Sequence, residues 1–229
     1  MATLNASKWG YIIGSSSTNF VTAATNGFSA INNPSADYAY AISYTAQSGR
    51  GSLTHAMVRT YAYFDTSSIT DTVTACTLNI EGYSLNSSDI FVIKSTAFGG
   101  DGSSSLTTGE FYTSLDYDTK YSYEITSWST SSNNSITLKD EALTAMTSNN
   151  HLILALVNAD YDAAKTGSAV AVINRSGIAF STTIYLDYQT EPAPPSSGIN
   201  SVIDVSSANI SKIYGTNYSN IDKIYDVSK

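Results

Sequence analysis

The sequence predicts an all-β protein: a jelly-roll-like antiparallel β-sandwich with one short helix, a Pro-rich linker and a short C-terminal segment of 11-residue repeats. Three observations predict it. Strand-like stretches recur at short spacing between clusters of Gly, Ser, Asn and Asp. The 229 residues are 42% hydrophobic and include 17 Tyr, while only 13% are charged, a composition typical of packed sheets. Only one stretch has a helical period.

The first clear strand, at residues 55–64, alternates in character. One face carries Val58, Thr60, Ala62 and Phe64, and the other carries Arg59, Tyr61 and Tyr63. After a turn at 65–71, residues 72–83 form a second strand with Cys76, Leu78 and Ile80 on one face. Further strands are predicted at residues 89–98, 121–128, 151–157, 168–180 and 183–190. Because HLILALV at 151–157 is continuously apolar, it is predicted to be a central strand covered on both faces.

Residues 138–150 carry the helical pattern. Ala142, Leu143 and Met146 recur at helical spacing, and Asp140 and Glu141 stand near the expected start, where carboxylates favour the positive end of the helix dipole. Asn149 and Asn150 are expected to close this helix of two to three turns.

The chain is predicted to divide into a sandwich at residues 1–190, a Pro/Ser-rich linker at 191–198 and three 11-residue repeats at 199–229. The repeats align in three apolar columns, which predicts that they bury these residues against each other or against a common partner. The columns are Ile199, Ile210 and Ile221; Val202, Ile213 and Ile224; and Ile203, Tyr214 and Tyr225. Each unit is expected to contain a short helical turn and a short extended piece, with a helix of about 3.67 residues per turn as the alternative.

The net charge is −8, from 11 basic and 19 acidic residues. The sequence contains no stripe of basic residues, so we do not expect the protein to bind nucleic acid. Cys76 is the only cysteine and is expected to be a small buried hydrophobe. We expect neither a signal peptide nor a membrane span, so the protein would be made in a cytoplasm and released by lysis.

Chemistry-bearing residues are sparse, so we expect no enzyme and no cofactor. His55 and His151 are the only histidines and are expected at strand ends on the surface. Asn158, Asp160 and Asp162 have the spacing that opens a calcium loop, but Ala163 and Ala169 replace the Gly and Glu of an EF-hand. A solvated turn is the favoured interpretation of these three residues, and a looser metal site is the alternative.

A polysaccharide depolymerase would need two facing carboxylates. Glu81, Glu110, Glu124 and Asp187 are the conceivable members of such a pair, and nothing in the sequence pairs them.

Aromatic residues offer one argument for binding. Tyr combines an apolar ring with a polar tip, which suits a sandwich core, a protein interface or a glycan platform. The candidate glycan or interface residues are Tyr61, Tyr63, Tyr121, Tyr123 and Trp128.

Residues 58–84, VRTYAYFDTSSITDTVTACTLNIEGYS, resemble the strand–turn–strand signature of jelly-roll modules related in form to carbohydrate-binding modules. Those modules typically have R-x-Y-x-x-F-D-x-S-S-I followed by A-x-L-x-I, and here Cys76 stands at the Ala position. The resemblance implies that the matching residues build the fold rather than a sugar site. They are Arg59, Tyr61, Phe64, Asp65, Ser67, Ser68, Ile69, Leu78 and Ile80.

The closing strand, linker and repeats resemble structural proteins of tailed, particularly marine, bacteriophages, in which a Y-L-D-Y strand precedes A-N-I-S-K-I repeats. This resemblance implies a virion protein displayed as a capsid decoration or as a tail-fibre component. Its partners would be other virion proteins or copies of itself, bound through the nine column residues. A glycan-binding module or adhesin for a host surface polysaccharide is the alternative.

Overall fold

A computed structural model describes residues 1–17, 20–33, 39–48, 52–85, 89–159, 162 and 175–192. The described chain belongs to one compact unit, Met1–Ala193. The nine column residues and both proposed conformations of the repeats therefore lie outside the described residues, and the three-part division of the chain stays a prediction.

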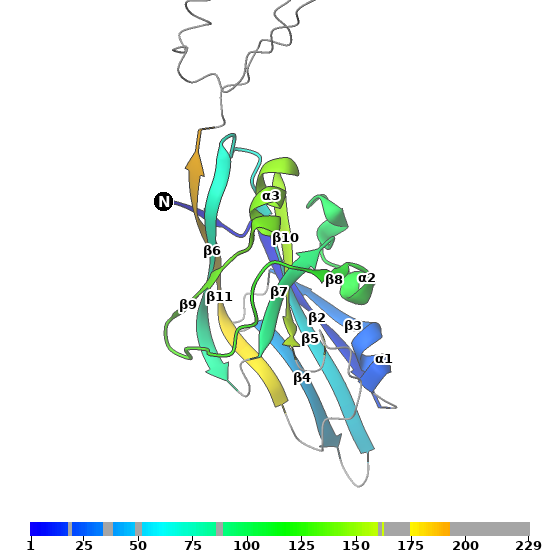
Figure 1. The fold of residues 1–229 in the computed structure, drawn as a ribbon. Helices are drawn as coiled ribbons and strands as arrows, with labels where there is room; N and C mark the ends of the chain where they lie inside the picture. Colours follow the sequence, from blue (N-terminus) through cyan, green and yellow to red (C-terminus); the bar gives the residue numbers. More distant parts are fainter. Residues whose placement is uncertain are drawn as a thin grey trace, which may run out of the picture. The chain divides into compact units, whose positions relative to one another are not determined.

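The protein is an antiparallel β-sandwich, as the sequence predicts (Figure 1). One layer contains β8, β7, β10, β5, β2 and β3, and the other contains β1, β11, β6 and β9, while β4 pairs with both β5 and β11 and so joins them. The strands are β1 (Ala2–Asn5), β2 (Lys8–Ser16), β3 (Gly27–Asn32), β4 (Ala39–Ser48), β5 (Ser52–Asp65), β6 (Thr72–Leu85), β7 (Ile90–Ser95), β8 (Leu115–Lys120), β9 (Asn133–Thr137), β10 (His151–Asn158) and β11 (Arg175–Glu191).

The prediction that residues 151–157 form a central strand is confirmed. β10 pairs with β5 on one side and β7 on the other. Its residues Leu152, Leu154 and Leu156 enter the core between the two layers. Its residues Ile153, Ala155 and Val157 enter a second core on the opposite face of the same sheet. A strand needs a continuous apolar run only when both faces are covered, and here both are.

In β5 and β6, alternate residues point to opposite faces of the sheet, as the alternation in their sequences predicts. Ala62 and Phe64 of β5 join the inter-layer core, whereas Tyr61 joins the second core. Cys76, Leu78 and Ile80 of β6 face the inter-layer core together. The second core is closed by residues on connecting segments and helices rather than by another sheet, namely Phe98, Leu106 and Phe111.

The helix at 138–150 is confirmed as α3 (Asp140–Ser148), with Asp140 and Glu141 in its first turn and Asn149 at its C-terminal cap. Asn150 adopts a left-handed conformation with φ 58°, which asparagine tolerates better than most residues. The expectation of a single helix is wrong. α1 (Phe20–Thr25), α2 (Glu110–Thr113) and the 3₁₀ turn η1 (Phe98–Gly100) are too short to produce a helical period in the sequence.

Two strand predictions need correction. Residues 121–128 do not form a strand: they begin with bends at Tyr121 and Ser122 and make one isolated bridge, between Ile125 and Ile90. The predicted strands at 168–180 and 183–190 are not separate in the described residues: β11 runs from Arg175 to Glu191, with register shifts that absorb the break in alternation. The sequence left the first fifty residues unassigned, and the structure forms β1 to β4 there.

Cys76 is buried, as predicted, and burial raises the pKa of its thiol to about 12. We expect the thiol to be inert to Ellman's reagent at pH 8 in the folded protein, since the thiolate is the reactive form, and to react completely in urea. Between pH 9 and 12 the unfolded thiol loses its proton and the folded one does not, so the free energy of unfolding should fall there. Rapid labelling of the folded protein would contradict this placement.

Candidate functional site

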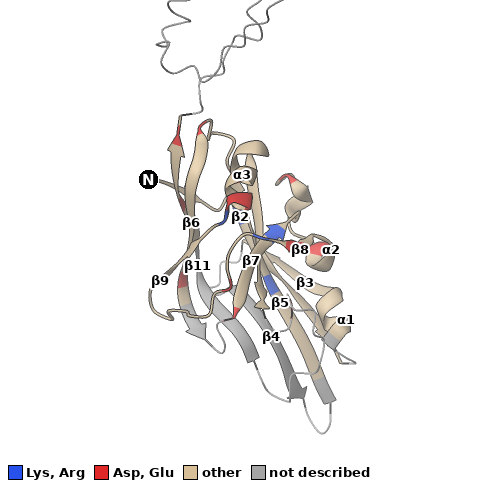
Figure 2. Ribbon diagram, in the orientation of Figure 1, with Lys and Arg blue, Asp and Glu red and all other residues tan. Residues whose placement is uncertain are grey.

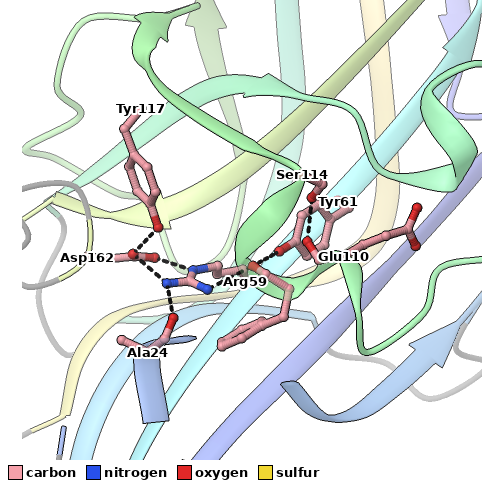
Figure 3. Close-up of polar contacts among 8 residues, drawn as sticks. Ala24, Arg59, Tyr61, Glu110, Ser114, Tyr117 and Asp162 are labelled. Carbon is pink, nitrogen blue, oxygen red and sulfur yellow. Dashed lines mark hydrogen bonds and ion pairs between the residues drawn. The ribbon is translucent and has the colours of Figure 1, made fainter. Parts of the chain in front are cut away.

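Arg59 is the one positively charged residue of the strand–turn–strand signature. It lies in β5, and its side chain is fully buried (Figure 3). Its Nε and Nη2 donate to the two carboxylate oxygens of Asp162 at 2.7 and 2.8 Å. Nη1 donates to the carbonyl of Phe111 and Nη2 to that of Ala24, both at 2.8 Å. A buried guanidinium is stable only when its charge and its N–H groups are satisfied, and these contacts satisfy both.

Aromatic residues complete the cluster. The Arg59 guanidinium carbon lies 4.0 Å from the centre of the Phe111 ring, a cation–π contact. The Tyr61 hydroxyl donates to the Phe111 carbonyl at 2.7 Å, and the Tyr117 hydroxyl donates to Asp162 Oδ1 at 2.5 Å. We call Ala24, Arg59, Tyr61, Phe111, Tyr117 and Asp162 the Arg59 cluster.

Charge and burial act together on the pKa values of the cluster. Burial by itself would lower the pKa of Arg59, but the carboxylate of Asp162 outweighs it and raises that pKa. Burial and the negative charge of Asp162 raise the pKa of Tyr117, and burial raises that of Tyr61. The arginine is therefore permanently charged and the two hydroxyls stay protonated. The cluster ties β5 to α1, α2, β8 and the segment after β10, which is a fold-building role.

Of the three proposed cation ligands, the structure describes Asn158 and Asp162, and both are engaged in other contacts. The solvated turn expected at Asp162 is wrong, because Asp162 is buried and its two oxygens accept from Arg59 and Tyr117, so the guanidinium would repel a metal ion there. Asn158 is buried and donates to the Asp89 carbonyl at 3.4 Å. Asp160 lies outside the described residues. Among those described, no group of three His, Cys, Asp or Glu side chains could hold a metal ion.

The four carboxylates that could have formed a catalytic pair have different contacts. Glu110 accepts from the backbone N–H groups of Thr107 at 2.7 Å and Gly99 at 3.0 Å, which fixes the start of α2. Asp187 accepts from Thr3 at 2.6 Å and Asn79 at 3.0 Å on the outer face of the sheet. Glu81 and Glu124 are exposed.

The surface prediction for His55 is wrong. His55 is buried inside β5, because the strand begins at Ser52 and is flanked by β2 and β4 at this position. His151 is half-buried at the start of β10, and its ring stacks on Tyr63 with centroids 6.0 Å apart.

The five candidate aromatic residues do not form one surface. Tyr61 is in the Arg59 cluster, and Tyr121 and Trp128 are buried in the inter-layer core. Tyr63 is partly buried and packs closely against Gly102. A Cβ atom added to Gly102 would lie only 2.3 Å from the nearest ring atom of Tyr63. Tyr123 is the exposed one, at 76%. The five residues therefore do not form a glycan platform of several rings, and only the ring of Tyr123 is freely exposed on the surface.

That ring stands at a groove, which is the candidate functional site. The groove has a volume of about 710 Å³ and lies between the connecting segment 122–129 and strand β9. Both walls are held in place: Ile125 and Ile90 exchange two backbone hydrogen bonds, and the Asn134 side chain bonds both the N–H and the carbonyl of Ser129. Lys139 Nζ lies 4.4 Å from the centre of the Tyr123 ring. We call this the β9 groove.

Sequence reasoning identified Tyr123 but missed both β9 and the pairing of Asp162 with Arg59. Arg59 stands on a largely apolar strand, and a buried arginine requires an acceptor, so the sequence did indicate that Arg59 has a partner. It could not indicate which one, because the chain has 19 acidic residues. β9 has the sequence NNSIT, whose Asn and Ser residues disfavour strands.

The chain matches no protein-family model and no curated protein with which it was compared. The structure itself defines an antiparallel β-sandwich braced by a buried arginine cluster, with a preformed groove at the side of the sandwich. No helix within the described residues combines the length and apolar character needed to cross a membrane.

Proposed function

We propose that this protein is a non-enzymatic structural component of a bacteriophage virion, displayed on the particle as a capsid decoration or as part of a tail fibre. The observation that carries the proposal is the use of Arg59 and Asp162. Asp162, which the sequence offered as a possible metal ligand, is instead paired with Arg59, and the pair braces the sandwich. The sequence resemblance of the closing strand and repeats to phage structural proteins supports the same role.

In this proposal the sandwich is the displayed body and residues 199–229 mediate attachment or self-association. The repeats contain three columns of apolar residues, which we expect to be buried against another protein surface. The partners are other virion proteins or further copies of the chain, and assembly follows synthesis in the host cytoplasm.

Removal of the repeats tests the proposal. A chain ending at Pro192 keeps every β11 pair, including Glu191 with Thr72, so the sandwich should unfold at an unchanged temperature. We expect this chain to lose incorporation into particles or self-assembly, measured by sedimentation with the assembled fraction. Normal incorporation would refute the attachment role.

A pair of substitutions in the full chain sharpens that test. Ile213→Asp with Ile224→Asp places charge in one apolar column and should reduce incorporation by about tenfold or more, because burying an unpaired charge is costly. Asn217→Asp adds a charge outside the columns and is the matched control, for which we expect normal incorporation.

Binding of a host surface glycan is the second candidate function, and the exposed Tyr123 ring beside the β9 groove favours it. An exposed aromatic face can stack on a sugar ring. A glycan array probed with the wild-type protein and with Tyr123→Ala tests it: a ligand bound only by the wild type is expected, and a silent array removes this candidate.

A further inference from the structure

Among the described residues, one edge of strand β9 is unpaired. The strand lies at the end of its sheet and pairs only with β6 in the described part of the chain. Two hydrogen bonds fix which backbone groups face β6: Leu138 N–H donates to the Cys76 carbonyl at 2.9 Å, and Gly82 N–H donates to the Ser132 carbonyl at 3.1 Å. In an antiparallel pair, alternate residues bond to the neighbour, so the even-numbered residues of β9 bond to β6.

The odd-numbered residues consequently direct their N–H and C=O groups away from β6. They are Asn133, Ser135 and Thr137, and like the other two residues of β9 they line the β9 groove. Their spacing of two residues is the repeat of a β-ladder, about 6.6 Å. On the side away from β6 the strand therefore has a regular row of three backbone donors and three acceptors, which is the pattern that another polypeptide strand matches.

This edge lacks the charges, the proline and the bulge that commonly protect an edge against strand addition. β9 contains no charged residue and no proline, and its pairing with β6 has no register shift. β8, at the other end of the sheet order, is protected: it carries Asp116, Asp118 and Lys120, and its pairing with β7 has a register shift. Sheet proteins commonly block edges with charges and bulges, so an unblocked edge in a preformed groove indicates recognition.

The charge around the groove selects the ligand. Glu124 lines it, and Asp140 and Glu141 stand in the adjoining depression that shares Tyr123. Figure 2 shows the acidic first turn of α3 just beyond the end of β9. Lys139, the cation at this end, is placed over the Tyr123 ring. A ligand with positive charge at the α3 end is electrostatically complementary, and the net charge of −8 favours its approach.

We propose that the β9 groove binds an extended, basic polypeptide segment of a partner protein, which adds to β9 as an antiparallel strand. The partner exchanges backbone hydrogen bonds with Asn133, Ser135 and Thr137. A Lys or Arg on the N-terminal side of its paired residues reaches Asp140 and Glu141. This goes beyond the proposed function, because it assigns an interaction surface to the sandwich itself and does not depend on the repeats.

An array of random twelve-residue peptides, probed with the full-length protein, supplies the ligand for the test. Bound peptides are expected to carry a basic residue. Each selected peptide is then resynthesised with single backbone N-methyl groups and measured by fluorescence anisotropy. Strand addition predicts that N-methylation at every second residue weakens binding by about tenfold or more while the residues between tolerate it, because only alternate N–H groups face β9.

Variants of β9 give an independent readout. Ser135→Pro removes one outward N–H without removing a bond to β6, and proline is tolerated on edge strands, so peptide affinity should fall about tenfold. Ser135→Ala is the matched control: it loses the side-chain bond to Asn79 but keeps the N–H, and should bind like the wild type. Glu141→Gln should weaken binding of basic peptides and reduce its salt dependence.

Several outcomes would overturn the proposal. They are an array without bound peptides, N-methyl effects without alternation, equal loss in Ser135→Pro and Ser135→Ala, and a glycan that competes with the peptides for the groove. The N-methyl series needs no protein variant, so it decides the question even if Ser135→Pro fails to fold. Loss of incorporation in the chain ending at Pro192 bears on the repeats alone, so the two proposals fail separately.

Discussion

Asp162→Asn should destabilise the sandwich by about 3–5 kcal/mol, the cost of leaving a buried charge unpaired. The substitution keeps the size of the side chain but removes the charge that balances Arg59, whose side chain has 1% exposure. For a unit of this size we expect the melting temperature to fall by roughly 10 °C. Urea unfolding monitored by tryptophan fluorescence, together with calorimetry, measures both quantities.

A double variant separates the lost charge from lost packing. Arg59→Met with Asp162→Leu removes the pair together, and buried pairs are often replaced by apolar residues at little cost. The carbonyls of Phe111 and Ala24 lose their donor, so recovery should be partial, with the double variant more stable than Asp162→Asn alone. A loss below about 1 kcal/mol in Asp162→Asn would show that water reaches Arg59 and would refute the buried pair.

Phe111→Ala is expected to have an effect of similar size, about 3–5 kcal/mol, because it empties the centre of the second core. The Phe111 side chain is fully buried and packs so tightly on β2 that a Cβ on Gly14 would lie 2.4 Å from its ring. The substitution also removes the ring that stacks on the Arg59 guanidinium, a contact that is stronger when desolvated. Chemical denaturation of the purified variant gives the value.

Two variants control this prediction. Tyr112→Ala changes the next residue, which is 42% exposed, and should cost less than about 1 kcal/mol. Phe111→Leu keeps most of the apolar volume and loses the aromatic face, so it reports the cation–π contact with a smaller cavity. If Phe111→Ala and Tyr112→Ala were equally mild, the second core would contribute little to stability.

The long strands and the main helix could be predicted because their own residues show how they are covered. β10 is apolar on both faces and is covered on both, and Cys76, Leu78 and Ile80 of β6 alternate because only one face of that strand meets the inter-layer core. α3 carries acidic residues at its start and asparagines at its end. Each signal is local to its element.

The short and polar strands could not be predicted in this way. β9, with its Asn and Ser residues, is a strand because β6 offers it a hydrogen-bonding edge, whereas residues 121–128 have the better strand pattern but bridge to β7 at Ile125 alone. Strand propensity measures packing on a pleated surface, so the neighbour decides the outcome when the side chains express no strong preference.

The candidate sites show the same division. Alternation placed Arg59, Tyr61 and Tyr63 on one face of β5, and the structure agrees, but no local pattern showed that this face is buried. It is covered by Leu106 and Phe111, from a connecting region that the sequence left without a clear element, and by Phe98, which was predicted to end a strand and lies in η1 instead. Of the three alternatives that the sequence left open for the five aromatic candidates, the core applies to Tyr61, Tyr121 and Trp128, and Tyr123 alone is largely exposed.

The sequence by itself determined the all-β class, the faces of the long strands and the position of α3, because hydrophobic periodicity is a local property of each element. Only the tertiary structure decided that Asp162 meets Arg59 across 103 positions, and that β9, which pairs with β6 alone among the described strands, lines a groove. Pairing between distant segments depends on chain topology, which brings together residues whose own neighbours in the sequence carry no record of the contact.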